Sequence, residues 1–510
     1  MILIVLIKLI AIVLIEPWVE KKILTAFNEK YREYTLEIGK VHILICKSGI
    51  DLEMITFSSK QGNGYDKSLR GEIASVKVTG IRVAKAIFKK NLDISEVIVT
   101  SSSIEGKMPF PKDSDPAQLS SANIRIGKIL FDKTDLAIVN TGNAQAFSLK
   151  EGVLKVYSLQ IEKLDTISPG IIKQFDFEAK ELQAVSADSM YSFIADRIAY
   201  SATSKKLAVQ SFYIKPNYSN YNFTARNTYE TIRFEALFSN VFVHGFPAMA
   251  YLQSGSLIST YINIGEMKID AFRDKRKELR HVTRPEFQDM IYNYPGTICI
   301  DTIVLISGNV NYTVHAKMAN EPGNISFNDI HTIIFRITND TVYKTNKAFL
   351  ELNGETLIMG KGRMTVNLKA EIFNNHNSFS LNGTLSNMEA KELNPILEKN
   401  AFVYATSGKI DAMNFSFMAN SVKATGKMTL LYHELDLAVK NKRTDDTTAI
   451  KERIISFIAN RKVLDSNPIP GNEVREGIID YERDPEKFLF HYCFKSVLTG
   501  VQSTLVKDPG

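Results

Sequence analysis

Apolar and polar residues alternate along most of the chain after residue 35. The clearest case is the run 363–372, in which Arg, Thr, Asn, Lys and Glu alternate with apolar residues. Successive side chains of a β-strand point to opposite faces, so this run predicts a strand with one apolar and one polar face. Four residues of its apolar face are candidates for the lining of a groove: Met364, Val366, Leu368 and Ile372.

Runs of the same kind predict further half-buried strands along the chain. They cover residues 36–45, 94–99, 124–131, 153–161, 207–214, 231–243, 257–264, 298–306 and 422–428. The pairs Asn353-Gly354 and Asn382-Gly383 are typical of tight hairpin turns. Turn residues also stand at 62–64, 140–142 and 321–323. So many strands with one apolar face predict a mainly β protein with a large antiparallel sheet.

Helical patterns are few. Apolar residues at helical spacing predict a helix over 19–34, and weaker patterns predict helices over 83–90 and 450–460. A short helical turn is predicted over 395–399, capped by Asn394. These helices are too few to cover the apolar face of a large sheet. The sheet therefore either closes on itself around a dry core or forms a groove that holds lipid, and the pattern leaves both open.

The amino terminus is apolar from Ile2 to Ile15 except for Lys8. A helix of that length spans about 21 Å, less than the ~30 Å of a bilayer core. One interpretation of this segment is a cleaved signal peptide, which would need a basic start and a small-residue cleavage site. Another is a buried core helix. We expect an uncleaved signal anchor of undecided orientation over residues 1–19, followed by a helix that docks on the sheet edge. The expected anchor residues are Ile2, Leu6, Ile10, Val13 and Trp18.

Composition narrows the class of protein. The chain has 510 residues, of which 45% are hydrophobic, enough for a large core. The net charge of +6 on 62 basic and 56 acidic residues is a weak bias that does not indicate nucleic acid. The cysteines, Cys46, Cys299 and Cys493, are too far apart for a zinc pattern or a disulfide framework.

The search for catalytic and binding motifs is negative. The run from Gly354 to Gly362 approaches a phosphate-binding loop, but its spacing is wrong, Gly362 replaces the Ser or Thr that binds magnesium, and a strand follows. His491 and Cys493 lie in a nearly all-apolar stretch, which favours packing over metal binding. We predict a protein that is not an enzyme, with no catalytic, cofactor or metal site.

One stretch stands out by charge. Residues 273–284 hold six Lys or Arg against two acids. A solvated connection after a strand is the favoured interpretation, and contact with phosphate or anionic lipid is the alternative. No aromatic and basic platform accompanies the stretch, so nucleic acid is not expected as a partner.

Several short motifs then occur in an order that resembles the AsmA-like family of bacterial envelope proteins. Glu16-Pro17 and a helix follow the apolar start. The later segments are VKVTGI at 76–81, LDISEVIV at 92–99, IDAFRDKR at 269–276, LNP at 393–395, SGKID at 407–411, ATGKM at 424–428 and YHEL at 432–435. The acidic residue usual after Tyr312 in this branch is replaced by Thr313.

The resemblance implies a curled, taco-like β-groove held by a single-pass helix in the inner membrane, with most of the chain in the periplasm. It implies a role in lipid binding or transport and in outer-membrane upkeep, with membrane lipids as partners and Met364, Val366, Leu368 and Ile372 in the groove. The expected parts are an anchor at 1–19, a helix with strands at 20–110, central sheet at 111–350, a further β region at 351–440 and a helical or irregular tail at 441–510.

Two other functions stay open. One is a non-enzymatic assembly or structural factor that contacts outer-membrane proteins or their assembly components through its sheet edges. The other is an envelope hydrolase, which would need a polar pocket with clustered titratable groups that the sequence does not reveal.

Overall fold

The computed structural model describes residues 14–60, 68–82, 91–108, 121–140, 146–163, 172–344, 349–439 and 463–506. The chain divides into two compact units. The first unit comprises Met1–Asn217 and Phe246–Ser254, and the second comprises Tyr218–Gly245 and Gly255–Gly510. Strands dominate both units, which confirms the predicted mainly β class. The helices predicted over 83–90 and 450–460 and the anchor residues Ile2, Leu6, Ile10 and Val13 lie outside the described residues.

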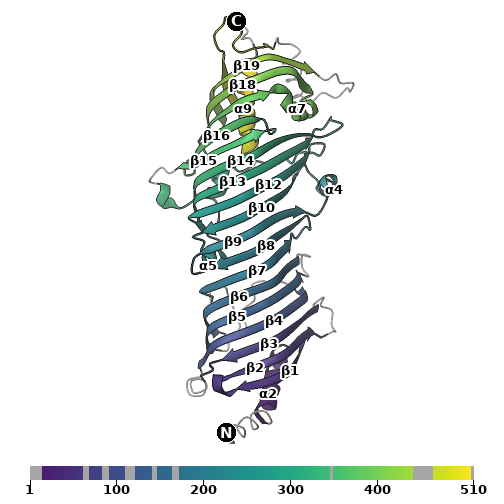
Figure 1. Ribbon diagram of the computed structural model, residues 1–510, viewed down its shortest axis with the longest axis vertical. Helices are drawn as coiled ribbons and strands as arrows, with labels where there is room; N and C mark the ends of the chain where they lie inside the picture. The colour runs from purple at the N-terminus through teal and green to yellow at the C-terminus, as the bar shows by residue number, and fades with distance from the viewer. Residues whose placement is uncertain are drawn as a thin grey trace. The chain divides into compact units, whose positions relative to one another are not determined.

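The first unit is built from strands that pair in chain order (Figure 1). They are β1 (Tyr34–Leu44), β2 (Gly49–Ser59), β3 (Ser68–Thr79), β4 (Asn91–Met108), β5 (Ser121–Asn140), β6 (Ala146–Lys163), β7 (Gln174–Val185), β8 (Tyr191–Ser201) and β9 (Lys206–Pro216). Its described helices are α2 (Glu16–Lys30), the 3-10 turn η2 (Ile45–Lys47) and α5 (Ala248–Ser254).

The second unit is also built mainly from β-strands. Its strands are β10 (Ile232–His244), β11 (Leu257–Ser259), β12 (Tyr261–Asp274), β13 (Ile298–His315), β14 (Gly323–Thr338), β15 (Phe349–Ile358), β16 (Gly362–Glu371), β17 (Phe379–Glu389), β18 (Val403–Ala419), β19 (Lys423–Val439) and β20 (Glu476–Glu482). Its described helices are α4 (Asn220–Ala225), α6 (Phe287–Tyr292), η4 (Thr341–Lys344), η5 (Ala390–Leu393), α7 (Asn394–Asn400) and α9 (Leu489–Leu505).

The sheets are mixed, which corrects the expectation of a purely antiparallel arrangement. Most neighbouring strands are antiparallel, but β4 and β5 are parallel, and β13 runs parallel to both β11 and β12. Parallel neighbours need a long return connection, and residues 275–297 with α6 supply one between β12 and β13. Within the described strands of each unit the sheet stays open, because the first and last strands do not pair with each other.

Bulges keep the apolar residues on one face of long strands. In the β5–β6 pair the register shifts on either side of Thr134, next to Lys133, which has a φ of 53°. In β6, Ser158 has a φ of 55°, and the apolar positions change there from Leu154 and Val156 to Leu159 and Ile161. An extra residue of this kind shifts the alternation by one position, so the apolar side chains return to the same face.

The two Asn-Gly pairs are not turns, and their prediction as hairpins is wrong. Gly354 lies inside β15 and Gly383 inside β17. A Cβ atom on Gly383 would lie 2.3 Å from the ring of Phe415 on β18, so glycine is needed where that ring crosses the neighbouring strand. The predicted turn at 321–323 is confirmed, since it leads from β13 into β14.

The predicted helix over 19–34 is α2, which begins at Glu16 and ends at Lys30, so Tyr34 belongs to β1. The expected docking on the sheet edge is confirmed. The Ile43 backbone N–H of the edge strand β1 donates a hydrogen bond to Glu16 Oε1 at 2.9 Å. Among the described residues, no helix is both long and apolar enough to cross a membrane.

Two smaller expectations are also corrected. Asn394 is the first residue of α7 and does not cap it, because its side-chain amide pairs with the backbone N–H and C=O of Ala405. The apolar stretch around His491 and Cys493 is the start of the helix α9, so these two residues do not share the face of a strand.

The core of the second unit lies between β15–β20 and α9. Its most deeply buried large side chains include Phe417, Met428 and Ile479, which are at most 2% exposed. Gly500 lets α9 approach the sheet closely, since a Cβ atom there would lie 2.9 Å from Ile479. In this part of the unit, α9 covers the apolar face of the sheet (Figure 1).

Candidate functional site

A row of apolar side chains crosses all nine strands of the first unit. Each member is the direct register partner of the next on the neighbouring strand. We call this the apolar row: Val41, Leu52, Val76, Val99, Phe131, Leu154, Phe177, Tyr200 and Leu207.

A second row on the same face runs beside it. Its members on β1 to β7 are Ile43, Ile50, Val78, Val97, Ile129, Val156 and Phe175. The two rows contain no charged side chain. Together they define the apolar face of the first unit.

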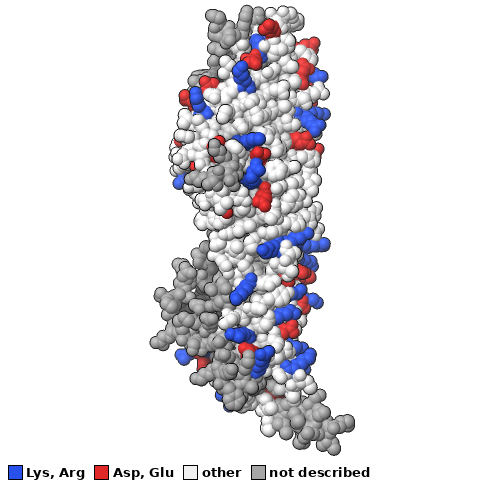
Figure 2. Space-filling view, turned by 90° about the vertical axis from the view of Figure 1, so that its left-hand side faces the viewer, with Lys and Arg blue, Asp and Glu red and all other residues white. Residues whose placement is uncertain are grey.

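Charged side chains lie on the opposite face of these strands, where they pair between neighbours. Lys128 Nζ lies 3.0 Å from Glu96 on β4, and Lys150 Nζ lies 2.7 Å from Glu181 on β7. Figure 2 shows many of the charged side chains along the right-hand margin of the view. The strands of the first unit therefore separate apolar from charged residues by face, as half-buried strands do.

The two units differ in what covers the apolar face. In the second unit, α9 packs against it from β15 to β20. In the first unit, α2 packs against the edge strand β1, and no other described helix makes comparable contact with a strand. Within the described residues, most of the apolar face of the first unit thus has no helical cover.

The predicted groove residues occupy the covered part of the second unit. Met364, Val366 and Leu368 point to the predicted face of β16, and Ile372 follows that strand. Leu368 is 7% exposed and Ile372 is 4% exposed, both inside the core beneath α9. The remaining predicted membrane residue, Trp18, lies on α2 and is 60% exposed.

At one end of β12 the apolar face of the second unit becomes basic. Ile269 and Ala271 belong to this face, and the same alternation continues to Arg273 and Lys275. Arg273 forms an ion pair with Glu230. Of the basic run 273–284, these two residues therefore extend the apolar face.

The other basic residues of that run have different partners. Arg276 pairs with Asp274 at 2.8 Å and lies over the ring of Tyr221 on α4. Lys277 donates a hydrogen bond to the backbone carbonyl of Asn227. The sequence interpretation of a solvated connection thus describes only part of the run.

Two lysines at or just before the start of α9 act on Lys275. The charges of Lys487 and Lys495 lower the pKa of Lys275, after burial as the largest cause, and the charge of Lys275 acts on His491. We call Lys275, Lys487, His491 and Lys495 the basic cluster. Lys275 is an exposed residue, so its amine remains open to solvent and to a ligand.

The charges of two carboxylates act on the basic cluster: Glu230 raises the pKa of Lys275, and Asp484 raises the pKa of His491. Burial lowers the pKa of Lys495, and burial followed by the charge of Lys495 lowers the pKa of His491 to about 4. His491 Nδ1 is buried and has no hydrogen-bond partner within the described part of the chain. In the same part, neither Lys275 nor Lys495 forms an ion pair.

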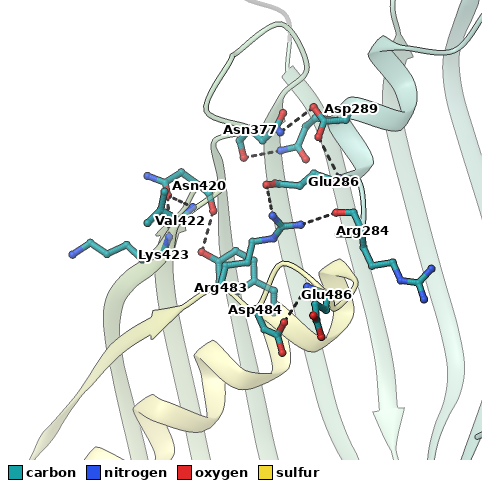
Figure 3. A network of polar contacts seen from close by, with 12 residues as sticks. Arg284, Glu286, Asp289, Asn377, Asn420, Val422, Lys423, Arg483, Asp484 and Glu486 are labelled. Atoms are coloured by element: carbon teal, nitrogen blue, oxygen red, sulfur yellow. Dashed lines mark hydrogen bonds and ion pairs between the residues drawn. The ribbon is translucent and has the colours of Figure 1, made fainter. Parts of the chain in front are cut away.

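A buried polar network fixes the start of α9 (Figure 3). Arg483 Nη1 lies 3.0 Å from Glu286 Oε1, and its Nη2 donates a hydrogen bond to the Arg284 carbonyl. On the same segment as Glu286, Asp289 accepts a hydrogen bond from Asn377 in the β16–β17 connection. The network joins the segment before α6 to the segment between β20 and α9, which contains Lys487.

Polar chemistry elsewhere is limited. The residues that the structure describes include no group of three or more His, Cys, Asp or Glu arranged to hold a metal ion. A shallow depression of about 260 Å³ near β7–β9 is lined in part by Asp176, Glu178 and Lys206. Asp176 already accepts hydrogen bonds from the Tyr157 hydroxyl and the Ala202 backbone. The depression therefore offers two carboxylates but no paired nucleophile and base.

Comparison with models of protein families and with curated proteins finds no match to this chain. The geometry of the apolar face and of the basic cluster therefore carries the argument for function.

Proposed function

We propose that the protein is a lipid-binding protein of the bacterial envelope, tethered to the inner membrane and acting in lipid transport and envelope maintenance. In this proposal the apolar face of the first unit holds acyl chains. The observation that carries it is the apolar row, which gives nine consecutive strands a continuous surface without charge. The resemblance to AsmA-like proteins agrees with it.

The energetics favour such a ligand. Each buried methylene contributes about 0.8 kcal/mol, so ten methylenes on this face would contribute roughly 8 kcal/mol before the cost of ordering the chain. No covalent chemistry is required for a lipid to enter, move along the face and leave. A non-enzymatic role therefore suits the rows of Val, Ile, Leu and Phe better than a hydrolytic one does.

The second unit supplies an internal comparison. There the same kind of face is covered by α9, and its side chains form a buried protein core. The equivalent residues of the first unit are buried or half-buried, for example Val156 at 4% exposed, and an acyl chain on this face would cover the part of their surface that still meets water.

The competing assembly-factor role depends on a strand edge that can pair with another chain. On β1, the Ile43 N–H is already bonded to Glu16 of α2, which reduces the donors that this edge offers. This contact favours the lipid-binding role over edge pairing at β1.

The test uses two substitutions at neighbouring positions of β5. Phe131 belongs to the apolar row, whereas Leu130 points to the charged face beside Lys155. The full chain, Phe131→Asp and Leu130→Asp are purified from the same membranes, and co-purified lipid is extracted and quantified by mass spectrometry.

We expect about one or more lipid molecules per protein in the full chain and in Leu130→Asp. Phe131→Asp should fall to the level of an unrelated membrane protein, because a carboxylate on the apolar face disfavours acyl chains. Circular dichroism confirms that both variants fold. Lipid at background level in the folded full chain, or equal lipid in both variants, would refute the proposal.

A further inference from the structure

We propose that the basic cluster binds the phosphate group of an anionic lipid whose acyl chains lie on the apolar face of β10–β14. The inference rests on the proposed lipid-binding function and adds a headgroup site to it. It concerns residues of the second unit alone.

The first argument is the change from apolar to basic along one face of β12. Met267, Ile269 and Ala271 alternate on this face, and Arg273 continues it. The paired strand β13 adds apolar residues, including Val310 opposite Ile269. An amphiphile with a long apolar part and one anionic end matches this order of side chains.

The second argument is that α9 brings further cations to the same end. His491 and Lys495 are four residues apart and so lie on one side of the helix. Phe490 contacts Phe327 of β14 edge to face, with ring centroids 6.2 Å apart, which places the helix start against this face. The positive end of the α9 dipole adds to the attraction for an anion.

The positive charges of the basic cluster outnumber the carboxylates that act on it. The carboxylates that act on the cluster are Glu230, already paired with Arg273, and Asp484, whose charge raises the pKa of His491 while three lysines lower it. Like charges that lie close together repel each other, and an anion among them would offset that repulsion. A phosphate provides several strong acceptor oxygens for these amines, and the buried Nδ1 of His491 offers another polar contact.

The experiment compares three probes on the full chain by isothermal titration calorimetry. Dihexanoyl phosphatidylglycerol carries both chains and phosphate, dihexanoylglycerol carries the chains alone, and inorganic phosphate carries the anion alone. The test variant is Lys275→Gln with Lys495→Gln. The control is Lys268→Gln, because Lys268 lies on the other face of β12 and pairs with Glu266 at 2.9 Å.

We expect the unmodified chain to bind the phospholipid at least about tenfold more tightly than dihexanoylglycerol, a difference that falls as salt is raised. The double variant should lose this difference and keep its affinity for dihexanoylglycerol, whereas Lys268→Gln should behave like the unmodified chain. Replacing both lysines by arginine should preserve binding, which separates loss of charge from loss of fold.

The possible outcomes distinguish failure of the headgroup site from failure of the lipid-binding function. Equal affinity for the two lipids, or a folded double variant that discriminates as before, overturns the headgroup site and leaves the apolar face intact. Binding of inorganic phosphate that the double variant loses, without binding of either lipid, supports an anion site for free phosphate and refutes the lipid-binding function.

Discussion

Arg483 Nη1 lies 3.0 Å from Glu286 Oε1, and the two side chains are only 10% and 7% exposed. The pair connects segments almost 200 residues apart, one before α6 and one before α9. Burial raises the pKa of Glu286, whereas the charge of Arg483 acts in the opposite direction. The ion pair thus stabilises the position of α9 only while both partners are present.

Arg483→Met should lower the free energy of unfolding by about 3–5 kcal/mol at pH 7, because it leaves a buried carboxylate without its partner. Without the arginine, the pKa of Glu286 rises further above its value in the unfolded chain. Stability is then lost as the pH rises through the folded pKa, so the deficit should be smaller near pH 4 than at pH 7. Urea unfolding of the variant and of the unmodified chain at both pH values measures this deficit in the free energy of unfolding.

Two variants control this experiment. Arg363→Met removes an exposed ion pair with Glu355 and should have little effect. Adding Glu286→Gln to Arg483→Met should recover part of the loss at pH 7. A deficit that is equal at the two pH values would show that lost packing, not the unpaired charge, dominates.

Gly383→Ala should destabilise the second unit by about 1–3 kcal/mol, because the new Cβ would overlap the Phe415 ring. Gly354→Ala is the matched control, since its nearest atom, Thr332 Oγ1, would be 3.2 Å away and the cost should be smaller. Adding Phe415→Leu to Gly383→Ala should recover only part of the loss, because the Thr365 backbone oxygen would still lie 2.8 Å from the new Cβ atom. Thermal unfolding of these three variants and of the unmodified chain tests this, and equal losses at the two glycines would contradict the steric explanation.

The same glycine shows where sequence reasoning succeeds and fails. Alternation alone predicted the strand β16 to within one residue at each end and assigned its faces correctly. The Asn-Gly pair at 382–383 failed as a turn signal because the need for space beside Phe415, a residue on another strand, overrides the local preference. Local patterns describe a strand well but do not reveal its neighbours.

The candidate site was less predictable for the same reason. The apolar row depends on register between strands and on bulges such as those at Lys133 and Ser158, which interrupt the period of two. Parallel pairing of β12 and β13 also leaves no local signal. The basic cluster brings Lys275 near Lys495, and 220 residues of sequence separate them.

Glu16→Ala should expose the edge of β1, because the Ile43 N–H would lose its acceptor. The loss of one hydrogen bond of about 1 kcal/mol should speed amide hydrogen exchange at Ile43 roughly fivefold. Glu29→Ala, on the exposed end of the same helix, is the control. Unchanged exchange at Ile43 would show that Glu16 does not protect this edge in solution.

His491 should make the second unit sensitive to acid. Lys495, Lys487, Lys275 and Asp484 face its ring, and burial with the charge of Lys495 lowers its pKa from 6.5 to about 4. Between these two pH values the unfolded chain binds a proton that the folded chain does not. The stabilisation is therefore complete above pH 6.5 and is lost as the pH falls toward 4.

His491→Gln should remove this pH-dependent stabilisation. The free energy of unfolding of the variant should therefore fall less between pH 6.5 and 4 than that of the unmodified chain, by roughly 1–2 kcal/mol after allowing for partial solvent access to the ring. His433→Gln is the control, because His433 lies exposed beside Asp411. An anion in the basic cluster would offset the lysine charges and raise the pKa of His491. Phosphate should therefore reduce the acid sensitivity of the unmodified chain and leave His491→Gln unchanged, whereas equal pH dependence in all three proteins would contradict a buried, neutral His491.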